Sequence, residues 1–236
     1  MTKNLPSLRE DNMNQRRMRI RAAAREIILS EGYQALTTRK VAALAGVTAP
    51  TVYNLIGPME DILAGLVDEG LNVIEGELTA ISRDLTGLET AERIVTVSIE
   101  VFSADADAYK AFTMAAEHQA MTAGPQPSGA NLIERCTRLQ INALTRARAE
   151  GDLRGELDVR LLAAHILSAF RTALRRWALG QLDDEGFRSE ALHGLAVCLL
   201  ADASEEARPR LQKMARDAEW AIAKAGRSKK KKPQEI

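Results

Sequence analysis

The chain has 236 residues, which is enough for one large domain or for a small module joined to a larger one. Its residues are 46% apolar but only 4% aromatic, and few stretches alternate as strands do, so the composition favours an all-α fold with a core of Ala, Leu, Val and Ile. The formal net charge of +0 excludes no class of partner by itself. The sequence has no signal-peptide core and no run near the roughly 18 apolar residues of a membrane helix, which predicts a cytoplasmic protein without membrane contact.

The N-terminal end is predicted to be a flexible polar arm over residues 1–13, followed by a helix over about 14–30. Ile20, Ala24, Ile27 and Ile28 share one face of this helix and predict its buried side. Gly32 is well placed to end the helix, because glycine accepts the left-handed conformation at little steric cost.

Two short helices are predicted next. The hydroxyl of Thr37 can cap the first, which Gly46 ends, and Thr48 can cap the second. Pro58 is acceptable in the first turn of a fourth helix, which the apolar pattern carries to about residue 80. Two short helices around a glycine turn, preceded by a bracing helix, match the helix-turn-helix pattern of DNA-binding proteins.

In that pattern the second helix of the pair enters the major groove, and the start of the first faces a phosphate. Thr51 can hydrogen-bond a base edge, whereas Arg39 is suited to a phosphate. The predicted DNA-binding residues are Thr37, Thr38, Arg39, Thr48, Ala49, Pro50, Thr51, Tyr53 and Asn54.

Charge is unevenly distributed along the chain. Residues 14–57 hold seven basic side chains against the two acidic ones of Glu26 and Glu31. A local basic surface on a neutral chain predicts one module that meets phosphate and another that does not. The basic residues are Arg16, Arg17, Arg19, Arg21, Arg25, Arg39 and Lys40.

Six further helices are predicted at about 90–104, 107–123, 130–150, 158–179, 184–202 and 205–225. The stretches "LTGLET" (85–90) and "AGPQPSG" (123–129) are predicted as loops, and residues 226–236 as a disordered basic tail.

The stretch "ILSEGYQALTTRKVAALAGVTAPTVYNLIGPMEDIL" (28–63) resembles the DNA-binding domain of the TetR family of bacterial transcriptional regulators. The resemblance covers about residues 16–67 and lies in Gly32-Tyr33, Thr37-Thr38, Ala45-Gly46-Val47, Tyr53 and the Glu60-x-x-Leu63 entry to the fourth helix. The chain departs from the family at three places. Asn54-Leu55-Ile56 replaces the usual ending of the recognition helix, Pro50 stands where glycine is frequent, and Pro58-Met59 replaces a Ser-Lys pair, so one phosphate contact is expected to be lost.

The resemblance implies a helix-turn-helix DNA-binding domain over residues 14–60 and a larger helical dimerisation and effector-binding domain over residues 61–225. It further implies a homodimeric repressor that binds double-stranded DNA at a palindromic operator and is released by a small-molecule effector. A helix-turn-helix DNA-binding protein with no effector stays open as the alternative.

Two late helices carry apolar stripes that fit a dimer surface made of a four-helix bundle, with the domain's own core, which each stripe must face in part, as the alternative. The stripes consist of Ile166, Phe170, Ala173, Leu174 and Trp177, and of Phe187, Leu192, Leu195, Ala196 and Leu199. Phe102, Phe112, His118 and Phe170 are candidates for an effector pocket, with a role of His118 in the core as the alternative.

No catalytic residue, metal site or cofactor is predicted, so we expect a protein that is not an enzyme. His118, His165 and His193 lack the spacing of a zinc site, and the GxSxG, P-loop and GxGxxG motifs do not occur in the chain. Cys136 and Cys198 lie far apart inside helical patterns, which predicts buried, reduced thiols.

Overall fold

The computed structural model describes residues 8–81, 84–123 and 127–229. Within these ranges the chain forms helices and no strand ladder, since the single β-bridge joins Leu153 and Ala203 in isolation. The predicted all-α fold is therefore confirmed. None of the helices in the same ranges is long and apolar enough to span a bilayer.

The chain divides into two compact units. The first holds the described residues up to Glu69 together with Asp107–Ala130, and the second holds Gly70–Ala106 and the residues from Asn131 onward. The sequence placed a boundary between residues 60 and 61, so it left a later segment out of the N-terminal unit. This segment is a helix whose Ala108, Phe112 and Ala115 belong to the same buried cluster as the apolar faces of the first helices.

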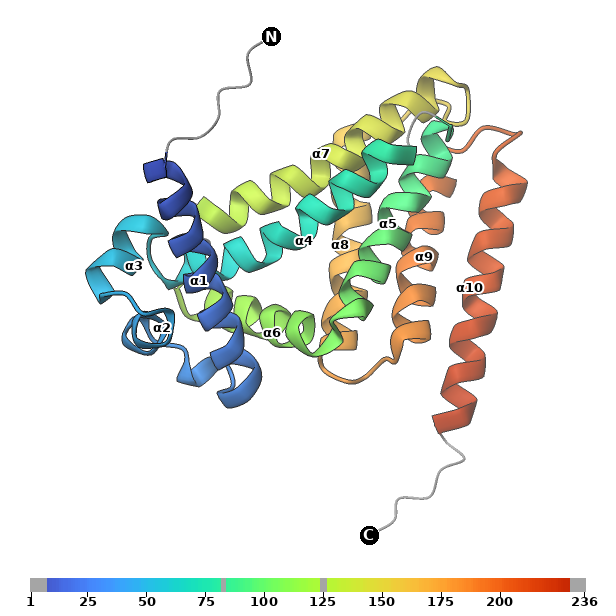
Figure 1. Cartoon of the computed structure of the whole chain (residues 1–236). Helices are drawn as coiled ribbons and strands as arrows, with labels where there is room; N and C mark the ends of the chain where they lie inside the picture. Colours follow the sequence, from blue (N-terminus) through green and yellow to red (C-terminus); the bar gives the residue numbers. More distant parts are fainter. Residues whose placement is uncertain (1–7, 82–83, 124–126, 230–236) are drawn as a thin grey trace. The chain divides into compact units, whose positions relative to one another are not determined.

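The first unit begins with a helix that starts before the predicted residue 14, so residues 8–13 are helical, while residues 1–7 of the predicted arm lie outside the described ranges. Figure 1 shows the two short helices α2 and α3 on one side of α1. The helices are α1 (Leu8–Glu31), the 3-10 turn η1 (Tyr33–Ala35), α2 (Thr38–Ala45), α3 (Ala49–Leu55), α4 (Met59–Ile81), which runs on into the second unit, and α6 (Ala106–Ala123).

The core of the first unit is built from the apolar faces that the sequence periodicity predicts. Ile20, Ala24 and Val41 are fully buried, and so are Val52 of α3 and Ile62 of α4. Removing such side chains from water supplies most of the free energy that holds short helices together, because α2 and α3 are too short to be stable alone.

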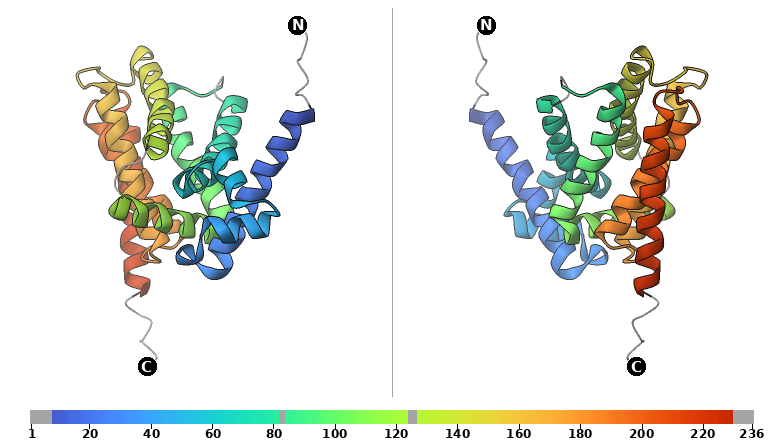
Figure 2. Two further views of the ribbon diagram at one scale, coloured as in Figure 1. Left: turned by 90° about the vertical axis from the view of Figure 1, so that its left-hand side faces the viewer. Right: turned by 90° about the vertical axis from the view of Figure 1, so that its right-hand side faces the viewer.

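The second unit is a helical bundle in which α9 packs against α8, α10 and α5. Both views of Figure 2 show α10 alongside α9. Residues 94–99 of α5 are all buried, so the middle of this helix is covered by neighbours on every side. The remaining helices are α5 (Gly87–Ala104), α7 (Pro127–Ala149), α8 (Val159–Ala178), α9 (Asp184–Leu200) and α10 (Arg208–Lys229).

Two helix boundaries differ from the prediction for identifiable reasons. The helix α5 begins inside the stretch predicted as a loop, because Thr86 and Glu89 form a reciprocal capping box at its start. The helix α10 continues to Lys229, into the predicted tail, and residues 230–236 of that tail lie outside the described ranges.

Candidate nucleic-acid interface

The turn between α2 and α3 is fixed by three residues. Thr37 caps α2 by accepting a hydrogen bond from the Lys40 amide, and Thr48 caps α3 by accepting one from the Thr51 amide. Between them Gly46 adopts φ 65° and ψ 40°, a left-handed conformation that side chains with a β-carbon disfavour. The chain can therefore turn sharply within the residues between α2 and α3.

One face of α3 is open to solvent. Ala49, Pro50, Tyr53 and Asn54 are exposed, with Tyr53 at 62%, whereas Val52 on the opposite face is fully buried. These positions share one side of the helix because Tyr53 follows Ala49 by four residues and Asn54 follows Pro50 by four. A helix anchored by one face and open along the other is suited to entering a groove of duplex DNA.

The hydroxyls of Thr48 and Thr51 lie 2.8 Å apart and hydrogen-bond to each other. This contact holds the half-buried Thr51 side chain in one orientation while leaving hydrogen-bonding capacity on both oxygens. A pre-oriented hydroxyl with its methyl group can distinguish base edges better than a freely rotating one.

The start of α2 carries the predicted phosphate contacts. Thr37 and Arg39 are exposed and Thr38 is half-buried, so all three lie at the N-terminal end of the helix where backbone amides lack partners. The neighbouring Lys40 is paired, because its ammonium group lies 2.5 Å from the Glu31 carboxylate.

The basic surface is smaller than the residue count indicates. Arg17 donates to the carbonyl of Leu55, and Arg21 forms an ion pair with Glu69 at 3.4 Å. With Lys40 also paired, at least three of the seven basic residues bind inside the unit. Arg16, Arg19 and Arg39 are exposed, as is the paired Lys40.

Residues 20–64 match the family model described as bacterial regulatory proteins of the TetR family. The chain carries a TetR N-terminal domain. The match confirms the resemblance seen in the sequence, and it spans α2, the turn and α3 in full. A search of curated protein sequences returned no significant match to the chain.

Solved structures of TetR-family proteins share the fold of this chain. A regulator from Syntrophomonas wolfei is 19% identical with a TM-score of 0.66, covering 80% of this chain and 95% of its own. The repressor FadR of Thermus thermophilus, solved with lauroyl-CoA, is 20% identical with a TM-score of 0.64 over 78% of this chain and 93% of its own. FadR of Bacillus subtilis, solved with stearoyl-CoA, is 21% identical with a TM-score of 0.62 over 77% of this chain and 97% of its own.

The predicted effector-pocket residues fall into both units. Phe112 is buried in the core of the first unit, where the exposed His118 makes an edge-on ring contact with Tyr33 at 5.7 Å. Phe102 and Phe170 lie in the second unit with their ring centroids 6.1 Å apart. The structure therefore divides the four residues between the two units, and it brings Phe102 and Phe170 into contact.

The predicted dimer stripes are largely buried within their own unit. Trp177 and Phe187 are fully buried and stack at 5.2 Å, and Phe170 packs against Phe187 at 5.5 Å. Most residues of the two stripes therefore pack in the core of their own unit, which is the alternative that the sequence left open. The buried members are Ile166, Ala173, Trp177, Phe187, Leu195, Ala196 and Leu199.

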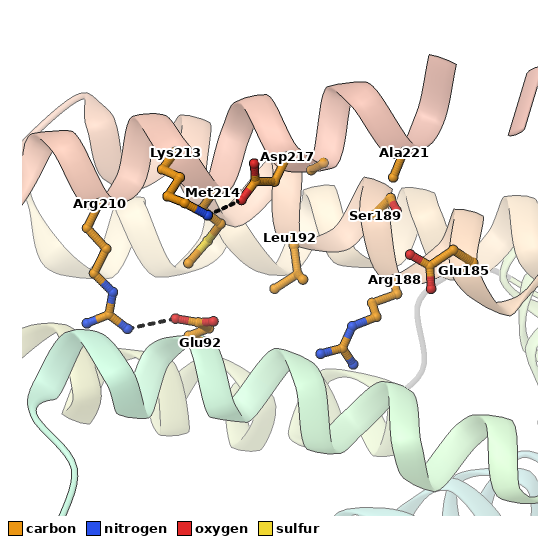
Figure 3. Close-up of a pocket in the computed structure, with 11 residues that line it drawn as sticks. Glu92, Glu185, Arg188, Ser189, Leu192, Arg210, Lys213, Met214, Asp217 and Ala221 are labelled. Carbon is orange, nitrogen blue, oxygen red and sulfur yellow. Dashed lines mark hydrogen bonds and ion pairs between the residues drawn. The ribbon is translucent and has the colours of Figure 1, made fainter. Parts of the chain in front are cut away.

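A groove of about 390 Å³ lies along α5, α9 and α10 in the second unit (Figure 3). Leu192 and Met214 contribute apolar surface to it. Arg210 pairs with Glu92 at 2.8 Å, and Lys213 with Asp217 at 2.7 Å, so the rim carries both signs of charge. None of the four predicted pocket residues lines this groove. Its lining joins α5 to the consecutive helices α9 and α10, which lie far from α5 in the sequence, and it includes Leu192 of the second predicted stripe.

The cysteines lack the surroundings of a reactive thiol. Burial raises the pKa of Cys136 to about 11 and also raises the pKa of Cys198. Both are therefore protonated, weakly nucleophilic thiols at neutral pH. Among the described residues, no group of three His, Cys, Asp or Glu side chains gathers as a metal site.

Proposed function

We propose that the chain is a sequence-specific DNA-binding transcriptional regulator that reads duplex DNA with α3. The observation that carries the proposal is the open face of α3, on which Ala49, Pro50, Tyr53 and Asn54 are exposed beside the oriented Thr48–Thr51 pair. Short side chains at the start of the helix permit close approach to base edges, and Arg39 at the start of α2 supplies a phosphate contact. Such a protein would act in the cytoplasm.

The proposed regulator acts as a homodimer on a palindromic operator. One recognition helix contacts too few base pairs to be selective, whereas two related by a two-fold axis read half-sites about 34–36 Å apart or a multiple of that distance. Apolar side chains support a dimer surface on the outer face of α8 and α9, since Leu161 is 65% and Val197 49% exposed. A short loop joins the two packed helices, so both residues lie at the same end of the pair.

A charge placed at Leu161 tests the dimer. Leu161→Asp should raise the dissociation constant of the homodimer by at least about tenfold, because a carboxylate would replace an exposed apolar side chain in the proposed contact. Arg160→Asp, at the neighbouring exposed position, is the matched control. Sedimentation equilibrium measures both, and an unchanged dimer in Leu161→Asp would exclude this face.

We further propose that the bound regulator represses transcription by occupying a promoter and that a small-molecule effector releases it. The FadR relatives solved with acyl-CoA ligands support an effector and make acyl-CoA compounds the first to test. The effector would favour a conformation in which α4, which runs from the TetR domain into the second unit, holds the recognition helices at the wrong spacing. If every compound that binds the protein leaves its affinity for the operator unchanged, the regulator without an effector is favoured.

Selection from a randomised pool of duplexes, together with the intergenic DNA beside the protein's own gene, tests the central proposal. The full chain should enrich one inverted-repeat sequence. Enrichment of no sequence at low ionic strength would overturn the proposal.

A further inference from the structure

The recognition helix α3 has only seven residues, so its two ends contribute much of its stability. Thr48 satisfies an amide at the N-terminal end. At the C-terminal end, the Ile56 amide donates to the Val52 carbonyl at 3.0 Å, which leaves the carbonyl of Leu55 beyond the helix's own hydrogen bonds. Carbonyls in the last turn of a helix need partners from elsewhere.

Arg17 of α1 supplies that partner. Its Nε donates to the Leu55 carbonyl oxygen at 2.9 Å, and its Nη1 donates to Asn14 Oδ1 at 3.2 Å. Asn14 of the same helix thus orients the guanidinium, and the guanidinium in turn binds the C-terminal end of α3. A cation at this end of a helix also interacts favourably with the helix dipole.

Side-chain packing holds the middle of α3 more tightly than its C-terminal end. Val52 is the one fully buried side chain of the helix, whereas Leu55 and the following Ile56 pack against the same core but are only half-buried. The backbone hydrogen bond at the C-terminal end therefore adds to a partial packing contact. The hydrogen bond from Arg17 and the cap at Thr48 therefore act together as the two end supports.

We propose that Arg17 is a positioning residue that fixes the tilt of the recognition helix and so sets how well the protein discriminates between DNA sequences. This inference rests on the proposed function and adds a residue outside the stretch 20–64 that the family model matches. It also separates Arg17 from its neighbour Arg16, which is exposed and suited to a phosphate.

Two duplexes test the inference with the full-length protein: one selected by the wild-type chain from a randomised pool, and a scrambled duplex of the same composition. In Arg17→Ala, the ratio of the two affinities should fall by about tenfold, the loss expected for one hydrogen bond to a charged group. The salt dependence of binding to the scrambled duplex should stay as in the wild type. Arg16→Ala should instead weaken both duplexes alike and lower the salt slope by about 0.9.

Asn14→Ala gives a test without any change of charge. It removes the second hydrogen bond of the guanidinium and should lower the affinity ratio in the same direction by a smaller factor, while the thermal unfolding midpoint shows that the chain is folded. The proposal is overturned if Arg17→Ala behaves like Arg16→Ala, or if neither Arg17→Ala nor Asn14→Ala changes the ratio. A wild-type chain that selects no duplex would instead refute the proposed function itself.

Discussion

Individual hydroxyl groups determine the geometry at the start of the recognition helix. The Thr48 oxygen accepts the Thr51 amide and also hydrogen-bonds to the Thr51 hydroxyl, so one capping residue orients its neighbour. Loss of such a cap costs about 1 kcal/mol of stability. The sequence predicted Thr48 as a cap and Thr51 as a base-reading residue, but the bond between them depends on side-chain orientation that no spacing reveals.

Thr51→Ala should relax base preference at one operator position, because the oriented hydroxyl and methyl group are lost. Arg39→Ala should weaken binding to all sequences similarly and lower the salt slope by about 1, since a phosphate contact carries no sequence information. Affinity measurements on an operator and its single-base variants compare the two. Equal effects of both substitutions on base preference would refute this division of roles.

Titration of the Glu75 carboxylate should change the free energy of unfolding. Arg135 donates to its two oxygens at 2.8 Å and 2.6 Å, and this pairing holds the pKa of Glu75 below its usual value. A carboxylate with a lowered folded pKa stabilises the protein above its unfolded pKa and loses that contribution as the pH falls through the folded value. Its side chain is 34% exposed, so water weakens the pair to about 1 kcal/mol.

Glu75→Gln should therefore destabilise the protein at pH 7 and leave it nearly unchanged at a pH below the folded pKa of Glu75, where the wild-type side chain is neutral as well. Glu134→Gln, at an exposed position of α7, is the control. Urea unfolding at both pH values measures the difference. A loss of equal size at acid pH would contradict the role given to this ion pair.

At the scale of elements, α5 and α7 approach so closely that their backbones nearly touch. A β-carbon on the buried Gly87 would lie 2.6 Å from the carbonyl oxygen of Ala143 and closer still to the amide nitrogen of Ala147. The Gly87 amide also donates to the Glu150 carboxylate at 2.5 Å. The start of α5 is thus fixed by a glycine that no larger residue can replace without moving a helix.

Gly87→Ala should lower the free energy of unfolding by about 3 kcal/mol or more, because the clash is with backbone rather than with a flexible side chain. Gly76→Ala is the matched control in α4, where nothing lies within 4 Å of the new carbon and the helix gains roughly 0.5–1 kcal/mol. Thermal and denaturant unfolding compare them. A Gly87→Ala variant as stable as the wild type would show that α5 and α7 can separate freely.

Apolar periodicity predicted the existence of every long helix, and the boundaries were harder to place. The stretch at 85–90 contains Gly and Thr and was therefore predicted as a loop, although its Thr86-x-x-Glu89 spacing is a capping-box signal that points to a helix start. The start of α1 was placed too late because residues 8–13 are mostly polar and form helix without an apolar stripe.

At the scale of the whole molecule, the sequence predicted the helix-turn-helix segment from α2 to α3 better than the other helices. The segment α2–turn–α3 has fixed local signals in Thr37, Gly46 and Thr48. The assignment of α6 to the first unit and the burial of Trp177 and Phe187 depend on contacts between distant segments. An apolar stripe looks the same in sequence whether it faces its own core or a second subunit.

Direct binding of DNA tests the account most sharply. The full chain should bind the intergenic duplex beside its own gene more tightly than a scrambled duplex in fluorescence anisotropy, with affinity falling as salt rises. Asn54→Glu on the exposed face of α3 should abolish this preference, whereas Gln212→Glu at an exposed position of α10 should preserve it. A wild-type chain without affinity for any duplex at low ionic strength, or equal binding by both variants, would contradict the role given to α3.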